Sequence, residues 1–388
     1  MSESLWVQAA KKIAIDIAGP NADAVDTEAR FPIEAINALK AAKLLSAYVP
    51  QSLGGAGASM TEICGICEVL GQHCTATAMI FAMHQIQVAS IVRHAVDSEW
   101  YREYLTRLVE HQYLIASVTS EVGVGGEMRS SRCAVEMGNE GRFALTKDAT
   151  TISYGAQADD LLITARRTPQ ASNNDQVLVL VHKADYTLTQ KGVWNTMGMR
   201  GTCSPPFLMS GSGVTDQVMK QPFGEISSQT VVPVSHLVWT HLWLGNVTAA
   251  VNKAGSFVRT QARSNPGTTP PTALRLAEVT VKLQNMRAVI RDALSEYETL
   301  CATPGEGEAT LSSMGYAFKI NNLKVDVSSK LPLIVTEALL ICGIMGYKND
   351  SKFSMSRHLR DAHSSALMVG NDRILATNAN LLLVLKDV

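Results

Sequence analysis

Apolar residues recur at helical spacing in the first 110 residues. Ile33, Ile36 and Leu39 lie three residues apart just after a proline, which predicts an amphipathic helix beginning there. Ser59 and Glu62 have the spacing of a capping box at a second helix start. The helices expected in this part therefore begin near residues 31, 59 and 100, and the second helical region continues through residue 93.

Between residues 113 and 223 the pattern changes to short runs of β-branched residues bracketed by turns such as Gly138–Gly141. The expected strands are Leu114–Thr119, Cys133–Met137, Arg142–Leu145, Asp160–Thr164, Val177–His182 and Thr187–Leu188. No helical pattern of 10–15 residues alternates with these runs, which disfavours a parallel Rossmann sheet. We expect a small all-β domain.

From about residue 231 the helical period returns over long stretches. The four helices expected are Val234–Arg263, Thr272–Leu300, Leu311–Met345 and Phe353–Leu385. The sequence therefore predicts an α+β protein with an N-terminal helical domain (1–112), a central β domain (113–228) and a C-terminal four-helix bundle (229–388).

Composition excludes several classes of protein. Of the 388 residues 46% are hydrophobic and 18% are charged, and the formal net charge is −1, so the chain buries a large core and is not a disordered protein. The chain has no excess of basic residues, so we expect no nucleic-acid partner. The first 19 residues carry scattered charges in place of a signal peptide, and the apolar stretch Leu331–Gly346 is too short for a membrane span. We expect a cytoplasmic protein with no membrane partner.

The short motifs give little chemistry by themselves. Cys64 and Cys67, with His73 and Cys74 nearby, superficially suggest zinc, but they sit in a continuous helical pattern and are better explained as core residues, so we expect no metal site. The glycines of 123–126 look like a phosphate-binding loop, yet no helix pattern follows closely. The usual hydrolase and kinase motifs are absent from the sequence.

Four stretches in chain order resemble the acyl-CoA dehydrogenase flavoprotein family. They are residues 31–57, with YVP and LGG; residues 119–126, TSEVGVGG, beside the family's T-E-P-G-A-G-S; residues 194–202, WNTMGMRGT, beside W-x-x-x-G-x-R-x-[ST]; and residues 342–347 with 360–362, beside G-G-x-G-[YF] and R-D-A. The resemblance covers essentially the whole chain. It implies the same three-domain fold and a bound FAD.

The resemblance also implies the cofactor contacts. The flavin ring would lie against Val118, Thr119, Ser120, Gly125 and Gly126, and against Thr151, Ile152 and Ser153, where the family usually has W-I-[ST]. Ser153 would hydrogen-bond near flavin N5. The family completes each FAD site with a neighbouring chain, which implies a homodimer or homotetramer. The remaining cofactor candidates are Arg263, Gly343, Asn371 and Arg373.

The catalytic base is where the chain departs from the family. The family glutamate, which removes the proton α to a thioester, falls on Val369, and the alternative location falls on Ser235 and His236. Neither location holds a carboxylate. Asp372, one helical turn beyond Val369, is the candidate replacement, and His363 lies two turns before Asp372.

We expect α,β-dehydrogenation of an acyl thioester, carried by coenzyme A or by an acyl carrier protein. The first alternative is a flavin monooxygenase of the same fold, which needs no α-base and would use His84, Ser153 and His363 as peroxide or substrate contacts. The second alternative is a non-redox protein that keeps the scaffold as a binding module.

Overall fold

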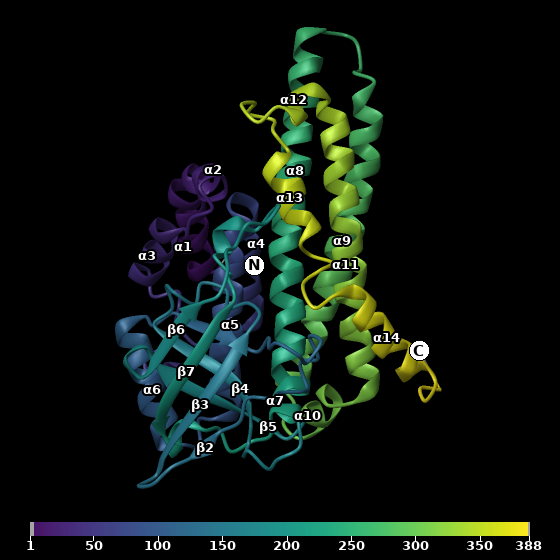
Figure 1. Cartoon of the computed structure of the whole chain (residues 1–388). Coiled ribbons are helices and arrows are strands. Elements are labelled where there is room, and N and C mark those ends of the chain that lie inside the picture. The colour runs from purple at the N-terminus through teal and green to yellow at the C-terminus, as the bar shows by residue number, and fades with distance from the viewer. Residues whose placement is uncertain (1–3, 387–388) are drawn as a thin grey trace.

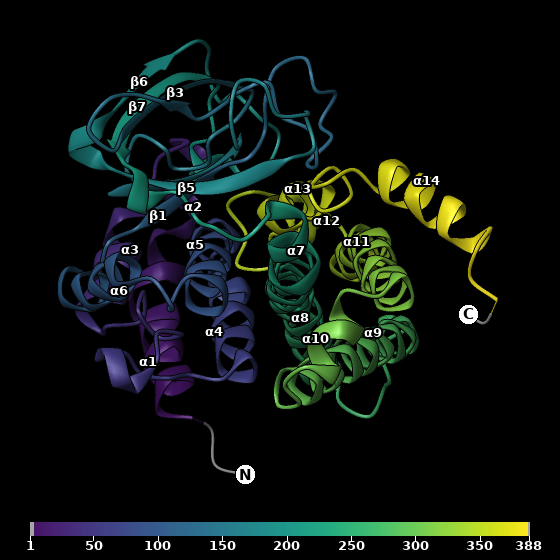
Figure 2. The same cartoon turned by 90° about the horizontal axis from the view of Figure 1, so that it is seen from below.

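A computed structural model of the chain describes residues 4–386. It has an N-terminal set of helices, a β domain and a tall C-terminal bundle, in that order along the chain (Figure 1). Seen from below, with the long helices viewed roughly along their axes, the β domain lies beside both helical parts (Figure 2). The α+β fold class expected from the sequence is confirmed. Residues 1–3 and 387–388 of the proposed domain ranges lie outside the described residues.

One of the N-terminal helices begins at the capping box that the sequence predicts. Ser59 and Glu62 form the expected capping box, with the Ser59 hydroxyl accepting from the Glu62 backbone N–H. Cys74 is extended and divides the expected continuous helix into two. The helices are α1 (Leu5–Ile13), α2 (Gly19–Thr27), α3 (Ile33–Ala41), α4 (Met60–His73), α5 (Thr75–His94) and α6 (Glu99–His111).

The β domain contains two sheets. β1 (Ile115–Val118), β4 (Asp160–Arg166) and β5 (Gln176–His182) form one, in which β1 pairs parallel to β4. The other has the order β2 (Glu136–Met137), β3 (Arg142–Ala149), β7 (Phe207–Val214) and β6 (Tyr186–Gln190). The sequence pattern missed β7, because its second half, Ser210-Gly211-Ser212-Gly213, has the composition of a turn.

The C-terminal bundle has three long helices where four were expected. After the short α7 (Phe223–Ile226) come α8 (Val232–Ser264), α9 (Thr272–Cys301), α10 (Glu306–Leu311), α11 (Met314–Cys342), α12 (Ile344–Tyr347), α13 (Ser356–His363) and α14 (Asn371–Leu382). The single helix expected over Phe353–Leu385 was wrong. The Ser364 and Ser365 hydroxyls bond to backbone carbonyls where a helix would continue, and Val369 has φ +46°. α14 projects away from the bundle (Figure 2).

Close backbone contact joins the N-terminal helices to the bundle. A Cβ on Gly71 would collide with the Leu242 carbonyl, and one on Gly245 would collide with the Glu68 carbonyl, so α4 and α8 meet where neither has a side chain. α5 is long and apolar enough to cross a membrane, but 89% of its most apolar window is buried inside the protein. Both α5 and α8 are therefore core helices.

Candidate functional site

The end of β1 and the segment after β3 meet at the edge of the β domain. The Ser120 hydroxyl donates to the Thr151 carbonyl (2.8 Å) and accepts from the Thr151 backbone N–H (3.1 Å). Thr119 bonds to Ser117 at 3.0 Å between the two hydroxyls. Val118 and Ile152 are buried side chains of the core. The structure thus brings the 118–120 and 151–153 segments together, with only the Ser and Thr side chains partly open to solvent.

The glycine-rich loop approaches α14. Gly123, Gly125 and Gly126 all have positive φ, which side chains rarely tolerate. The Arg373 guanidinium donates to the Gly125 carbonyl, and a Cβ on Gly126 would collide with that guanidinium. A serine at position 126, as the family often has, would therefore compete with Arg373 for the same space.

Ser153 lies in a short chain of hydroxyl groups. It accepts a hydrogen bond from Ser204 (2.9 Å), and Ser204 is also 2.9 Å from the Thr202 hydroxyl. Thr202 belongs to the 194–202 stretch. The 194–202 stretch therefore helps to fix the Ser153 side chain, through Thr202 and Ser204.

The same stretch is clamped to α13. Asp361 accepts from the Met199 backbone N–H (2.7 Å), and Arg360 pairs with Asp26 and donates to the Met197 carbonyl (2.8 Å). Burial raises the pKa of Asp361 to about 6, against the opposing effects of Arg357 and of the Met199 N–H. Met199 and Asp361, which are 162 residues apart, thus belong to one junction between the three parts of the chain.

Val369, where the resemblance would put the family base, lies in the connection between α13 and α14. Val369 adopts a left-handed backbone there, which is costly for a β-branched residue. The Lys324 ammonium donates to the Val369 carbonyl (3.2 Å) and to the Asn371 side-chain oxygen (2.7 Å). Ser328 donates to the same oxygen (3.1 Å). This connection is therefore held by a buried cation, and no carboxylate pairs with Lys324 among residues 4–386.

The alternative base position lies close to this cation. Ser235 donates to the Val231 carbonyl, and the His236 ring nitrogen Nδ1 is 3.1 Å from the Ile320 carbonyl, one turn before Lys324 on α11. Burial lowers the pKa of His236 to about 4, with a further lowering by Lys324. Burial also lowers the pKa of Lys324 to about 8. The structure thus gathers both base positions around groups that carry no negative charge.

Two of the candidate catalytic residues lie on the surface. Asp372 is exposed in the first turn of α14, where a negative charge suits the helix dipole, and its carboxylate makes no hydrogen bond or ion pair within residues 4–386. His363 is exposed at the end of α13. His84, by contrast, is fully buried, with Nε2 at 2.8 Å from the Leu45 carbonyl and Nδ1 accepting from the Ile115 N–H. Both His84 nitrogens are occupied, as in a core histidine.

Two cofactor candidates lie far from the others. Arg263 is near the C-terminal end of α8, about 45 Å along the helix from its first residue at about 1.5 Å per residue. Gly343 lies between α11 and α12, at the same upper end of the bundle (Figure 1). Within one chain they do not meet the loop of residues 119–126.

Comparison with known proteins decides the family. The model described as "Acyl-CoA dehydrogenase, N-terminal domain" matches residues 2–112, and "Acyl-CoA dehydrogenase, C-terminal domain" matches residues 235–380, together more than half of the chain. The chain belongs to the acyl-CoA dehydrogenase family. It is 22% identical over 379 residues to "Probable acyl-CoA dehydrogenase FadE25" of Mycobacterium tuberculosis, covering 96% of this chain and 92% of that protein.

Two solved structures share the acyl-CoA dehydrogenase fold. FMN-bound TdsC from Paenibacillus sp. A11-2, also described as a dibenzothiophene monooxygenase, has a TM-score of 0.84 and 18% identity and covers 98% of this chain and 97% of its own. Butyryl-CoA dehydrogenase from Megasphaera elsdenii has a TM-score of 0.81 and 17% identity and covers 99% of both chains. The chain is therefore an oxidoreductase of the flavoenzyme class.

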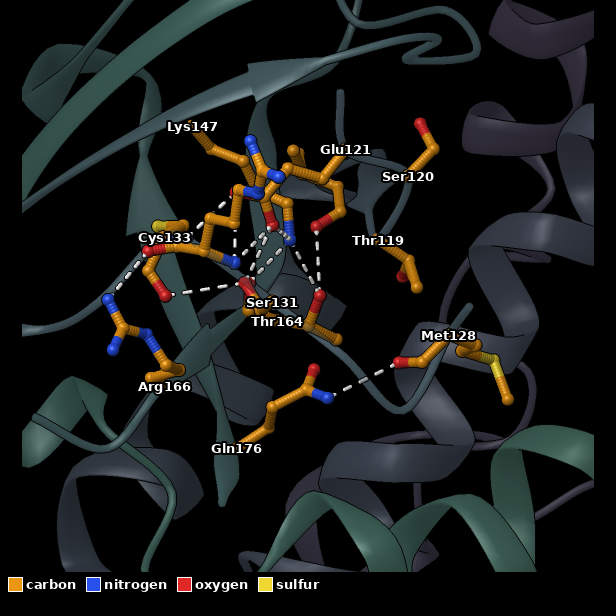
Figure 3. A network of polar contacts seen from close by, with 12 residues as sticks. Thr119, Ser120, Glu121, Met128, Ser131, Cys133, Lys147, Thr164, Arg166 and Gln176 are labelled. Atoms are coloured by element: carbon orange, nitrogen blue, oxygen red, sulfur yellow. Dashed lines mark hydrogen bonds and ion pairs between the residues drawn. The ribbon is translucent and has the colours of Figure 1, made fainter. Parts of the chain in front are cut away.

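Three residues of this acyl-CoA dehydrogenase family member were missed from the sequence. Lys324 has no marker beyond its place in an apolar helix face. Glu121 and Lys147 form a buried ion pair behind the glycine loop, with 3.6 Å between Lys147 Nζ and a Glu121 oxygen (Figure 3). Lys147 could have been found, because it continues the inward alternation of Phe143 and Leu145 along β3.

Proposed function

We propose that this chain is an FAD-dependent dehydrogenase that removes hydrogens from the α and β carbons of an acyl thioester. The observation that carries the proposal is the meeting of three separate family segments: Ser120 bonds to Thr151, and Arg373 bonds to Gly125. When bound, the flavin supplies the acceptor for the β-hydrogen.

The residues present fit a flavin. The space around Gly125 is open, whereas the Arg132 and Arg373 guanidinium groups lie against Gly123 and Gly126. Ser120, Thr151 and Ser153 add hydroxyl groups at the same edge of the domain. Arg373 offers a positive charge suited to a cofactor phosphate. We therefore place the ring against residues 118–126 and 151–153, and a phosphate near Arg373 and Asn371.

Asp372 is our candidate for the group that accepts the α-proton. It is the carboxylate next to Asn371, whose side chain Lys324 holds in place. Its exposure at the start of α14 leaves it free to meet a substrate, although a helix-stabilising role is the simpler alternative. His363 would then assist from the end of α13.

A second copy of the chain would complete the cofactor site. Arg263 and Gly343 are remote from the glycine loop in one chain, and the surface around Gly343 exposes Leu340, Ile344 and Tyr347. Exposed apolar residues of this kind suit a contact between subunits. We propose a homodimer or homotetramer in which one chain lends these residues to its partner.

A monooxygenase is the second candidate. The absence of a carboxylate at Val369 and Ser235 favours it, and so does the similarity to TdsC, whose structure holds FMN. The thioester proposal is supported by relatives named as acyl-CoA dehydrogenases. Those names specify a coenzyme A thioester, which makes coenzyme A our first candidate for the carrier and an acyl carrier protein the second.

Anaerobic spectroscopy distinguishes these functions. The purified chain is expected to be yellow, to release FAD on denaturation and to bleach near 450 nm when butyryl-CoA or a butyryl carrier protein is added. Asp372→Asn should abolish the bleaching while Asp350→Asn, an exposed control, retains it. Full activity of Asp372→Asn would remove Asp372 as the base. Turnover only with a flavin reductase and oxygen would support the monooxygenase, and a colourless protein that takes up no flavin would refute both.

A further inference from the structure

Glu121 closes the base of the glycine loop. Its buried carboxylate accepts from the Ser131 hydroxyl (2.7 Å), the Cys133 backbone N–H (2.8 Å) and the Arg132 backbone N–H (3.1 Å). These bonds join the residue that follows Thr119 and Ser120 to the point where the chain returns to the β domain. Residues 122–130 therefore form a loop with both ends fixed by one side chain.

Lys147 fixes Glu121 from the other side. It is fully buried, and its ammonium donates to the Thr164 carbonyl (2.6 Å) and the Thr164 hydroxyl (2.8 Å), as Figure 3 shows. Lys147 lies on β3 of the four-stranded sheet, and Thr164 lies on β4 of the three-stranded sheet. The ion pair thus ties the loop to both sheets at once.

A buried ion pair of this kind needs a reason other than stability. Burial lowers the pKa of Lys147, which reflects the cost of keeping its charge away from water. Replacing such pairs by apolar side chains is often neutral or stabilising. What the pair supplies here is position, because it fixes both ends of a loop in which Gly123, Gly125 and Gly126 all have positive φ.

We propose that Glu121 and Lys147 are positioning residues for the flavin, and that their ion pair aligns the N–H groups of the glycine loop with the cofactor. This inference rests on the proposed function, because it takes the loop as a flavin contact. Neither residue needs to touch the cofactor. Their effect passes through the backbone of residues 122–130.

The test compares Glu121→Met/Lys147→Met with Lys282→Met/Glu337→Met. The control removes a Lys–Glu pair between α9 and α11, in the bundle. Three quantities are measured on flavin-free protein: the thermal midpoint, the Kd for FAD and FMN from flavin fluorescence, and hydrogen exchange of residues 122–130. Single variants are expected to unfold easily, since each leaves one buried charge unpaired, and the double variant recovers most of that loss.

We expect the Glu121→Met/Lys147→Met variant to bind flavin on the order of tenfold or more weakly, by analogy with the loss of supporting contacts behind metal ligands, and to exchange faster in residues 122–130. The control should change neither. A double variant with wild-type Kd and wild-type exchange would overturn the inference. If the wild-type chain binds no flavin, the proposed function fails, and unchanged exchange in the double variant then decides separately against the positioning role.

Discussion

The glycine loop of residues 122–130 and the connection of residues 364–370, which we assign to the proposed flavin site, are held in opposite ways. The first is closed by a carboxylate that a lysine neutralises, Glu121 with Lys147. The second is held by Lys324, with no carboxylate paired to it among the described residues. The contrast teaches that the two segments are held independently, because each depends on its own buried charge.

The largest expected effect comes from restoring the missing carboxylate. In the Asp372→Asn background, where our candidate base is removed, Val369→Glu should raise the rate of anaerobic flavin reduction by an acyl-CoA by about 10²- to 10⁴-fold, the usual gain from a positioned general base. Glutamate is not β-branched and tolerates the left-handed backbone of position 369 better than valine. Val369→Gln is the matched control without a base. Equal rates in the two variants would show that more than this one carboxylate separates the chain from its dehydrogenase relatives.

The junction between Asp361 and the 194–202 stretch, which precedes the connection of residues 364–370, should depend on pH. The pKa of Asp361 is raised to about 6 from 3.8, so the folded state holds a proton that the unfolded state has lost between those values. The wild-type protein should therefore lose roughly 3 kcal/mol of stability as pH rises from about 4 to 6. Urea unfolding of the wild type and Asp361→Asn checks this. The difference between them should change across that window, and a constant difference would contradict the raised pKa.

The Lys324→Met variant tests whether Lys324 holds the connection of residues 364–370. The variant should release the connection, seen as faster hydrogen exchange of residues 364–371, while residues 122–130 stay protected. Because the folded pKa of Lys324 is lowered to about 8 from 10.5, the folded state binds fewer protons between these values. Wild-type stability relative to the variant should therefore rise from pH 8 to 10.5 in urea titrations. Faster exchange in both loops would break the proposed independence.

The smallest effect separates two neighbouring glycines. Gly125→Ala and Gly126→Ala both place a side chain at positive φ, at about 1 kcal/mol each. Only Gly126→Ala displaces the Arg373 guanidinium, since the space around Gly125 is open. Flavin titration should show a few-fold weaker binding for Gly126→Ala than for Gly125→Ala. Equal Kd values would remove Arg373 from the cofactor contacts.

Much of the fold follows from local pattern. Three features lie in contiguous residues: the capping box at Ser59, the helical repeat of apolar residues in α8 and the alternating burial along β3. Local interactions therefore suffice to predict them. The prediction of a fourth bundle helix was wrong because the apolar spacing continues through residues 364–370. In the structure, serine hydroxyls and the left-handed Val369 end the helix there. The sequence did not predict strand β7, because its glycines have low strand propensity and pairing with β3 and β6 stabilises it.

The sequence by itself determined the family and the three-part order of the chain, because both follow from residue types at fixed spacing. Only the tertiary structure decided which groups hold the two loops. Glu121 with Lys147, and Lys324 with Val369, come together from segments 26 and 45 residues apart or more, through sheet pairing and helix packing. The role of a buried charge depends on the group it pairs with, and the fold determines which group lies beside it.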